Sequence, residues 1–459
     1  MISRLLALQV FLYPLLFLSV GGVSAVKLVG IILLLLVVFK WTKSDLRPRI
    51  PSMQKPARLL ILFVGYTLVC QLIFGLFGVA LYGELPASGG SEPIERFAVQ
   101  LFASLQLYVF CYLLYEFAQR KPEVPAKAFQ LAMLVMIATG IYEIFSIYVG
   151  GPSIPLTLGG RDAIVNQNLS ELLGARRLHG LAGEPRFFAA LAVMLLNALI
   201  FAVIIRKTHG ARSRRRRRVA MFLGVPILLV LIFQTQSSSG LIMLALMPLM
   251  TVLILKQSFA SKIKLAVFAT LIALLFSPLL FDLYASRVIE RIQEEVFSNQ
   301  HLGSEMSAYV DVPIVGLIAM DATDATPMAL LLDKPFLTIT GLGAGNISTY
   351  VKPYLPNYGG YWGYGFTGIV EPNLGILKAI LNYGLIGNFF LIFAFWKFSR
   401  HYKHFGFAYD ERMVFSFFLC TGSIFCTYLF TAPFIYALLF LSFHAGLVAS
   451  FDRIKNGTA

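Results

Sequence analysis

Long apolar runs separated by short polar segments dominate the pattern along the chain. A helix that crosses a bilayer needs about 20 mostly apolar residues, and the sequence holds about twelve runs near that length. We expect helices at about residues 4–21, 25–41, 59–82, 97–117, 127–149, 187–205, 219–236, 240–255, 263–281, 373–395, 413–430 and 433–450. The pattern therefore predicts an all-α polytopic membrane protein with about 12 transmembrane helices.

The polar segments between these runs divide the chain into three parts. Residues 1–281 are expected to carry helices one to nine, and residues 373–459 helices ten to twelve. Residues 282–372 are expected to form one large outer loop between helices nine and ten. No internal repeat is apparent, which counts against a transporter built from duplicated halves.

The charge balance supports a membrane protein and orients it. Only 13% of the 459 residues are charged and 58% are hydrophobic, whereas soluble domains carry about 25% charged residues. The formal charge of +15 includes the dense basic run Arg214–Arg218. Because Lys and Arg collect on the cytoplasmic side, this run predicts that both termini are cytoplasmic. A contact with anionic lipids explains such a run better than a nucleic-acid site, so we expect no nucleic-acid partner.

The four cysteines lie inside apolar runs and have no metal-ligand spacing. They are Cys70, Cys111, Cys420 and Cys426. Small apolar packing residues are the expected role for such cysteines. We therefore expect neither a disulfide framework nor a metal site.

The most polar stretch next to an apolar run reads RRLHGLAGEPRFF and begins at position 176. Ionisable groups beside a bilayer core line a polar site or pair with one another. Guanidinium groups bind phosphate oxygens through two parallel hydrogen bonds. The alternative interpretation is interfacial anchoring combined with a helix cap. The stretch predicts a phosphate-binding site with five candidate residues, which are Arg176, Arg177, His179, Glu184 and Arg186.

A second polar group opens the tenth expected helix. Glu371 and Asn373 flank a proline there, and Lys378 and Asn382 follow four residues apart on one helix face. A lysine inside an apolar helix is expected to face protein or a water-filled cavity. The group predicts a polar pocket; helix capping with a structural Lys–Asn pair is the alternative.

Three further features are candidates for substrate contact. Ser238 lies in the polar turn QTQSSSG, where simple turn chemistry is the alternative. Arg287 and Arg291 lie four apart on an expected interfacial helix over 283–299, where pairing with nearby glutamates is the alternative. Tyr361 and Trp362 lie in an aromatic stretch that suits either a sugar or the membrane interface.

The order of these features resembles the Wzy-type O-antigen polymerase and ligase superfamily. The resemblance rests on a polar helix start, a Ser-Ser-Gly turn, a large outer loop with a G-x-G-x-G turn at 341–345, and a polar-x-Asn helix start followed by G-x-x-G at 384–387. It covers about residues 170–395. The Gly183–Arg186 run is most similar to O-antigen and exopolysaccharide polymerases.

This resemblance implies a glycosyltransferase of the GT-C kind at the periplasmic face of the bacterial inner membrane. Such an enzyme takes a glycan from undecaprenyl pyrophosphate without a metal or another cofactor, and it acts with membrane lipids and a chain-length co-polymerase. The resemblance implies that pyrophosphate is bound by arginines of the two larger outer loops. In this chain they would be Arg176, Arg177 and Arg186, with Arg287 or Arg291.

One departure from the family pattern bears on the reaction. Ligases of the family commonly carry His-Asn where this chain has Glu371-Pro372-Asn373. A carboxylate can deprotonate an attacking sugar hydroxyl, so the departure favours a polymerase. Glu184 and Glu371 are alternative bases, with His179 a third candidate. An O-antigen ligase, a lipid-linked oligosaccharide flippase and an elongation-type peptidoglycan polymerase stay open as other functions.

Overall fold

The chain folds into a bundle of long helices with a small cap of short elements at one end. The structure, a computed structural model, describes residues 1–15, 19–20, 23–42, 55–82, 93–150, 157–158, 178–182, 185–205, 220–235, 237–254, 307–313, 316–357, 372, 374–405, 411–429 and 434–455. Its long helices are α1 (Ile2–Leu12), α2 (Ala25–Thr42), α3 (Lys55–Tyr82), α4 (Pro93–Arg120), α5 (Glu123–Val149), α7 (Pro185–Ile205), α9 (Val225–Gln234), α10 (Ser238–Ile254), α12 (Ala322–Asp333), α15 (Gly375–Phe405), α16 (Glu411–Leu429) and α17 (Phe434–Lys455).

The described helices agree with the predicted apolar runs. Eleven of the twelve runs hold a helix, and the ninth, 263–281, lies outside the described residues. Four helices of the described part are long and apolar enough to cross a membrane, over 57–82, 97–120, 123–149 and 375–399, and six shorter apolar helices accompany them. These features are those of a membrane-embedded α-helical protein; the total of twelve spans stays a prediction.

A few short elements interrupt the helical pattern. The strands β4 (Ser307–Val312) and β5 (Gly316–Asp321) form an antiparallel hairpin with Ser307 opposite Asp321. The two-residue strands β1 (Ser19–Val20), β2 (Val23–Ser24) and β3 (Thr157–Leu158) form a second small sheet. Short helical turns complete the description: η1 (Tyr13–Leu15), η3 (Gly180–Ala182), η4 (Ala220–Gly224), α13 (Phe336–Thr340), α14 (Ile347–Tyr350) and η5 (Lys352–Asn357).

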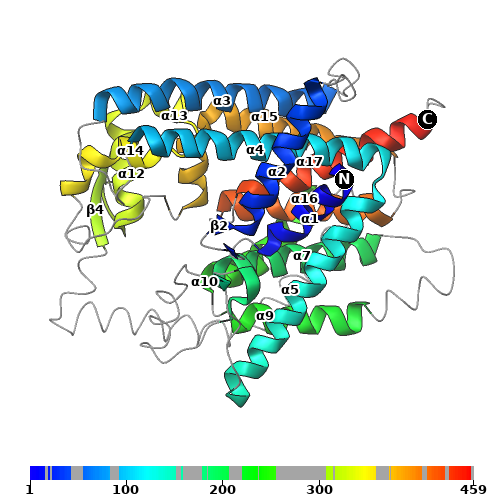
Figure 1. The fold of residues 1–459 in the computed structure, drawn as a ribbon. Coiled ribbons are helices and arrows are strands. Elements are labelled where there is room, and N and C mark those ends of the chain that lie inside the picture. Colours follow the sequence, from blue (N-terminus) through cyan, green and yellow to red (C-terminus); the bar gives the residue numbers. More distant parts are fainter. Residues whose placement is uncertain are drawn as a thin grey trace.

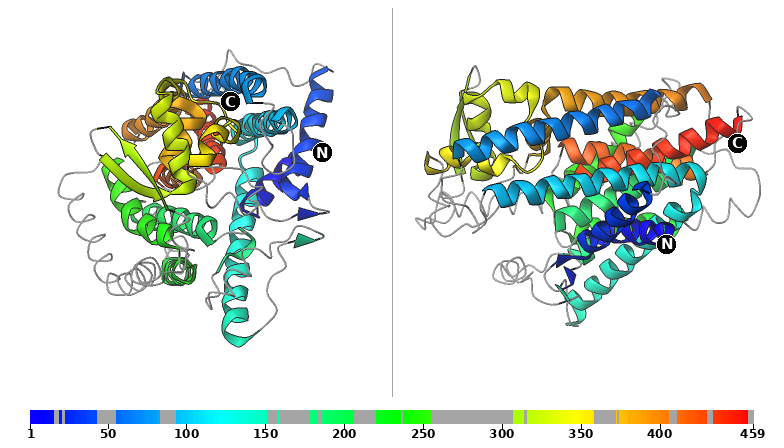
Figure 2. Two further views of the ribbon diagram at one scale, coloured as in Figure 1. Left: turned by 90° about the vertical axis from the view of Figure 1, so that its left-hand side faces the viewer. Right: turned by 45° about the horizontal axis from the view of Figure 1, so that its top comes forward.

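The long helices α3, α4 and α15 run side by side (Figure 1), and α3 packs on both of the others. The hairpin β4–β5 and the helices α12, α13 and α14 lie together at one end of this row, and the C-terminus lies toward the other end (Figure 1). Seen along the row, α3, α4 and α15 appear nearly end-on, and α12–α14 lie in front of them (Figure 2). The fold therefore has one capped end, where α3 ends and α4, α7 and α15 begin.

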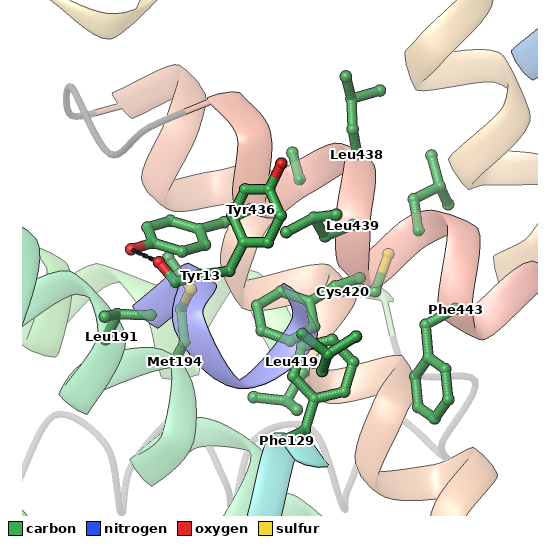
Figure 3. Close-up of a cluster of buried hydrophobic side chains, with 14 of the residues drawn as sticks. Tyr13, Phe129, Leu191, Met194, Leu419, Cys420, Tyr436, Leu438, Leu439 and Phe443 are labelled. Atoms are coloured by element: carbon green, nitrogen blue, oxygen red, sulfur yellow. Dashed lines mark hydrogen bonds between the residues drawn. The ribbon is translucent and has the colours of Figure 1, made fainter. Parts of the chain in front are cut away.

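The main hydrophobic core joins the N-terminal helix to the two C-terminal helices. Figure 3 shows Tyr13 and Tyr436 clustered with side chains from α5, α7 and α16, and the Tyr436 hydroxyl donates to the Tyr13 carbonyl at 3.4 Å. Helices α4 and α17 touch through their backbones, because a Cβ on Gly446 would lie 2.4 Å from the Tyr115 carbonyl oxygen. A small residue at such a crossing is typical of packed membrane helices. All four cysteines are free and buried, which confirms their predicted packing role.

Helix α15 is broken within its first third. Gly384 has φ of 60° and ψ of 177°, a conformation outside the helical region. The carbonyls that this break frees are not left open, because Asn388 Nδ2 donates to the carbonyls of Ala379 at 2.9 Å and Gly384 at 2.6 Å. The Tyr428 hydroxyl in turn donates to Asn388 Oδ1 at 2.6 Å. The break in α15 is therefore stabilised by hydrogen bonds from side chains of the bundle.

Candidate functional site

The structure describes part of the set of site residues predicted from the sequence. His179, Arg186 and Lys378 are described with their side chains, and Ser238 is described as the first residue of α10. The remaining predicted residues lie outside the described part of the chain: Arg176, Arg177, Glu184, Arg287, Arg291, Tyr361, Trp362, Glu371 and Asn373. The expected interfacial helix over 283–299 also lies outside it.

A buried carboxylate on α5 holds the polar segment that precedes α7. Glu143 Oε2 accepts backbone N–H bonds from His179 at 3.2 Å and from Gly180 at 2.5 Å. Its Oε1 lies 3.0 Å from His179 Nε2, and the two side chains expose only 7% and 12% of their surface. One side chain of α5 therefore fixes two consecutive residues of the segment.

The hydrogen-bond geometry engages both nitrogens of the His179 ring. Nδ1 lies 2.9 Å from the Gly180 carbonyl oxygen, which only accepts, so Nδ1 carries a hydrogen. One further proton then lies between Nε2 and Glu143 Oε1, shared by an imidazolium–carboxylate pair or by a neutral imidazole and a carboxylic acid. In this arrangement His179 positions the segment, and neither ring nitrogen is left over to bind a substrate.

Two glycines make room for this arrangement. Gly180 has φ of +52°, and a Cβ there would lie 2.7 Å from the Phe188 ring. A Cβ on Gly140 of α5 would also lie 2.7 Å from that ring. The Phe188 ring, fully buried at the start of α7, thus fills the space between α5 and the turn. This packing sets the direction in which α7 leaves the polar segment, with Pro185 as its first residue.

The serine-rich turn before α10 lies against the same segment. The Leu178 N–H donates to the Gln234 carbonyl at 3.1 Å, and the Gln234 side chain bonds to the Tyr148 hydroxyl on α5. A Cβ on Gly240 would lie 2.5 Å from Ala189 Cβ, so α10 starts in direct contact with α7. Two groups that the sequence predicts separately, the His179 segment and the 234–240 turn, are therefore one structural unit.

Within the turn, the described serine contacts are those of ordinary turn chemistry. Ser237 Oγ accepts the Gly240 N–H at 3.3 Å and lies 2.9 Å from Ser239 Oγ. Such side-chain bonds cap the first turn of a helix. They match the alternative interpretation for this stretch, with Ser237 as the capping residue.

Arg186 lies in the first turn of α7 and is half-buried. Its guanidinium carbon lies 5.1 Å from the centroid of the Phe187 ring. Stacking on an aromatic face holds the planar guanidinium group in place. The positive end of the α7 dipole adds to its charge, so this position favours an anion.

The described members of the second predicted group, Lys378 and Asn382, lie on another element, α15. Lys378 is half-buried on α15, and Asn382, one turn further, is buried. The buried Asp324 of α12 caps the start of α15, because its Oδ1 accepts the Leu374 N–H at 3.0 Å. The described contacts here fit helix capping as well as a polar pocket.

Sequence reasoning missed Glu143, although a signal was present. It is a carboxylate within the apolar run 127–149, and such a residue is expected to face the bundle interior and find a partner. Among the described residues, no group of three His, Cys, Asp or Glu side chains lies close enough to hold a metal ion. No known family model, curated protein or solved structure matches the chain.

Proposed function

We propose that the chain is a glycosyltransferase that polymerises undecaprenyl-pyrophosphate-linked oligosaccharide repeat units. In this proposal it acts at the periplasmic face of the bacterial inner membrane, with twelve spans, both termini cytoplasmic, and a chain-length co-polymerase as partner. The resemblance stated above supplies the reaction. One structural observation supports the choice of site, namely the anchoring of the His179 segment by Glu143.

This observation supports the proposal because a phosphate site needs positioned charge. In either proton arrangement the Glu143–His179 pair carries no net charge, and Glu143 also accepts two backbone N–H bonds. The pair therefore does not oppose an incoming pyrophosphate, and Arg186, eight residues along from Leu178, lies in the first turn of α7 at a defined place. Positioned cationic groups that meet charge as it develops on a leaving group lower a barrier more than mobile ones do.

The distribution of basic helix ends supports the proposed orientation. Arg58 lies in the first turn of α3, Arg120 ends α4, and Lys397 lies in the last part of α15. These helix ends point away from the capped end of the bundle (Figure 1). Under the positive-inside rule the capped end is periplasmic, where lipid-linked repeat units are polymerised.

In the proposed reaction, Arg176, Arg177 and Arg186, with Arg287 or Arg291, hold the pyrophosphate of the donor. A carboxylate, Glu184 or Glu371, removes a proton from the acceptor sugar hydroxyl, whose oxygen then attacks the anomeric carbon. The bond from that carbon to the pyrophosphate oxygen breaks, and undecaprenyl pyrophosphate leaves with the electron pair. Contacts from Ser238, Asn373, Lys378, Tyr361 or Trp362 would orient the glycans.

Cells that lack the gene test this proposal by the length of their surface glycan. We expect complementation with Arg186→Ala to leave single repeat units in place of a ladder, with about a tenfold or greater loss of polymer, because a bidentate phosphate contact is lost. Arg186→Lys keeps the charge and should restore part of the polymer. Gel analysis of extracted glycan, with the amount of membrane-inserted protein measured for each variant, gives the result.

The same cells separate the alternatives. Polymer that accumulates on the lipid carrier without reaching lipid A core would indicate a ligase. Repeat units held at the cytoplasmic face would indicate a flippase and would contradict the enzyme proposal. Arg120→Ala, which removes an exposed arginine at the other end of the bundle, is the matched control and should leave the ladder unchanged.

A further inference from the structure

Residues 334–350 form a hairpin that runs along α3 and returns. At its start, Lys334 Nζ donates to the Tyr82 hydroxyl at 2.8 Å, at the capped end of α3. At its end, the Tyr350 hydroxyl donates to the Phe74 carbonyl at 3.0 Å, and its ring meets that of Tyr82 edge-on. Figure 1 shows α13 and α14, the two short helices of this hairpin, beside the same end of α3.

The tip of the hairpin lies near the middle of α3. A Cβ on Gly343 would lie 2.3 Å from Gln71 Cα, so the two backbones touch. Gln71 is eleven residues from Tyr82, which corresponds to about 16 Å along a helix axis. The candidate span Ala57–Tyr82 of α3 has 26 residues, or about 39 Å at the same rise. Because the hydrocarbon core of a bilayer is about 30 Å thick, the tip lies at the depth of that core if α3 spans the membrane.

Polar side chains of α3 satisfy the backbone of the hairpin at that depth. Gln71 Nε2 donates to the Ala344 carbonyl at 2.8 Å, and the Tyr66 hydroxyl donates to the Thr340 carbonyl at 2.8 Å. Asn346 Nδ2 donates to the carbonyls of Gln71 at 3.1 Å and Leu342 at 2.8 Å. Irregular backbone is tolerated within a bilayer only where the protein supplies such partners.

N–H groups of the hairpin also satisfy backbone carbonyls next to the break in α15. The N–H groups of Leu342 and Gly343 donate to the carbonyls of Leu381 at 2.6 Å and Asn382 at 2.9 Å. Contact is close enough that a Cβ on Gly341 would lie 2.4 Å from the Gly384 nitrogen. The hairpin and the broken part of α15 are therefore two irregular segments that pack together and share backbone hydrogen bonds.

The outer face of α13 is apolar and uncovered. Phe336 exposes 53% of its surface and Ile339 52%, whereas Leu337 between them is fully buried. The neighbouring faces of α3 and α15 show the same character: Leu76, Phe77, Ile376 and Phe389 are between 57% and 60% exposed. Helix α13 packs against α15, and α15 and α3 are both candidate membrane spans with exposed apolar side chains of their own.

We propose that residues 334–350 form a re-entrant membrane hairpin whose face at Phe336 and Ile339 contacts lipid acyl chains. Lys334 and Tyr354 hold its outer ends near the interface: the Tyr354 hydroxyl donates to the Asp333 carboxylate, and burial together with this bond raises the pKa of Tyr354. This part of the predicted periplasmic loop 282–372 then lies within the bilayer. The inference does not depend on the proposed glycosyltransferase activity.

Single-cysteine labelling tests this hairpin. In a chain whose four native cysteines are replaced by alanine, we expect a membrane-impermeant maleimide to label Ile339→Cys and Phe336→Cys at least about tenfold more slowly than Asp311→Cys. Membrane fragments open on both sides make the result independent of orientation. Both side chains of α13 are exposed in the protein, so lipid is what would shield them.

The controls calibrate the two environments. Asp311→Cys, exposed on β4, represents water, and Phe77→Cys, 60% exposed on α3, represents lipid. The thiols of the four single-cysteine variants should react equally once each protein is denatured in detergent. A fluorophore on Ile339→Cys should also be quenched by phospholipid that carries a spin label in its acyl chain. Labelling of Ile339→Cys as fast as Asp311→Cys, without such quenching, would overturn the proposal.

Discussion

Replacing Gly343 with alanine is expected to destabilise the protein far more than replacing Gly150, although both glycines have φ of +79°. An L-residue in this left-handed region costs about 1–2 kcal/mol at either position. At Gly150 nothing lies within 4 Å of the added Cβ, so that cost is the whole effect. At Gly343 the Cβ would lie 2.3 Å from Gln71 Cα and 2.5 Å from its nitrogen.

The second cost at Gly343 arises because neither backbone can give way easily. Moving the hairpin off α3 would break the bonds between Gln71 and Ala344 and between Asn346 and Gln71. Each such bond contributes about 1 kcal/mol, and more where its partner is left buried and unpaired. We expect a total loss of about 3–5 kcal/mol for Gly343→Ala against about 1–2 kcal/mol for Gly150→Ala.

Thermal unfolding of the purified protein in detergent measures this difference. Gly65→Ala on α3, where nothing lies within 4 Å and the backbone is helical, should be neutral or slightly stabilising. Equal unfolding midpoints for Gly343→Ala and Gly150→Ala would contradict the packing of the hairpin against Gln71.

Removing the Glu143 carboxylate is expected to destabilise the segment before α7 and to reduce activity. Glu143→Leu would leave two backbone N–H groups and the His179 ring without their acceptor in a buried place. Loss of one partner of a buried pair costs about 3–5 kcal/mol. Glu143→Gln keeps one acceptor oxygen, so we expect it to lose less than Glu143→Leu.

A double-mutant cycle separates the energy of the Glu143–His179 side-chain pair from that of the two backbone hydrogen bonds to Glu143. Because His179→Leu removes the group that Glu143→Leu leaves unpaired, the double variant should be more stable than the sum of the single losses predicts. Glu123→Gln, an exposed carboxylate at the start of the same helix, is the control and should change neither stability nor glycan length. Strict additivity of the Glu143 and His179 losses would show that the two side chains do not interact.

Apolar periodicity accounts for the helices but not for what lies between them. Runs such as 59–82 and 127–149 predict α3 and α5 nearly to their ends, because about 20 consecutive apolar residues have few other stable states. The hairpin β4–β5 was not anticipated, since short strands inside a long polar segment carry little signal. Local sequence therefore predicts the long helices and does not predict the short strands.

The contacts that matter most for the candidate site are long-range. Glu143 and His179 are 36 residues apart, and the Gln71–Ala344 bond spans 273 residues. Glycines at 341, 343 and 384 are visible in the sequence as turn or motif residues. Their role in fitting a hairpin into a broken helix depends on which backbone approaches them, and this is known only from the fold.

The most direct test of the proposed function uses the purified protein in lipid nanodiscs with an undecaprenyl-pyrophosphate-linked oligosaccharide as the only glycan. We predict products that are integer multiples of the repeat unit, with one undecaprenyl pyrophosphate released for each new linkage. Arg186→Ala should form few or none of these products while remaining folded. An unchanged substrate with the folded wild-type protein, or hydrolysis to free oligosaccharide without longer chains, would contradict the proposed polymerase.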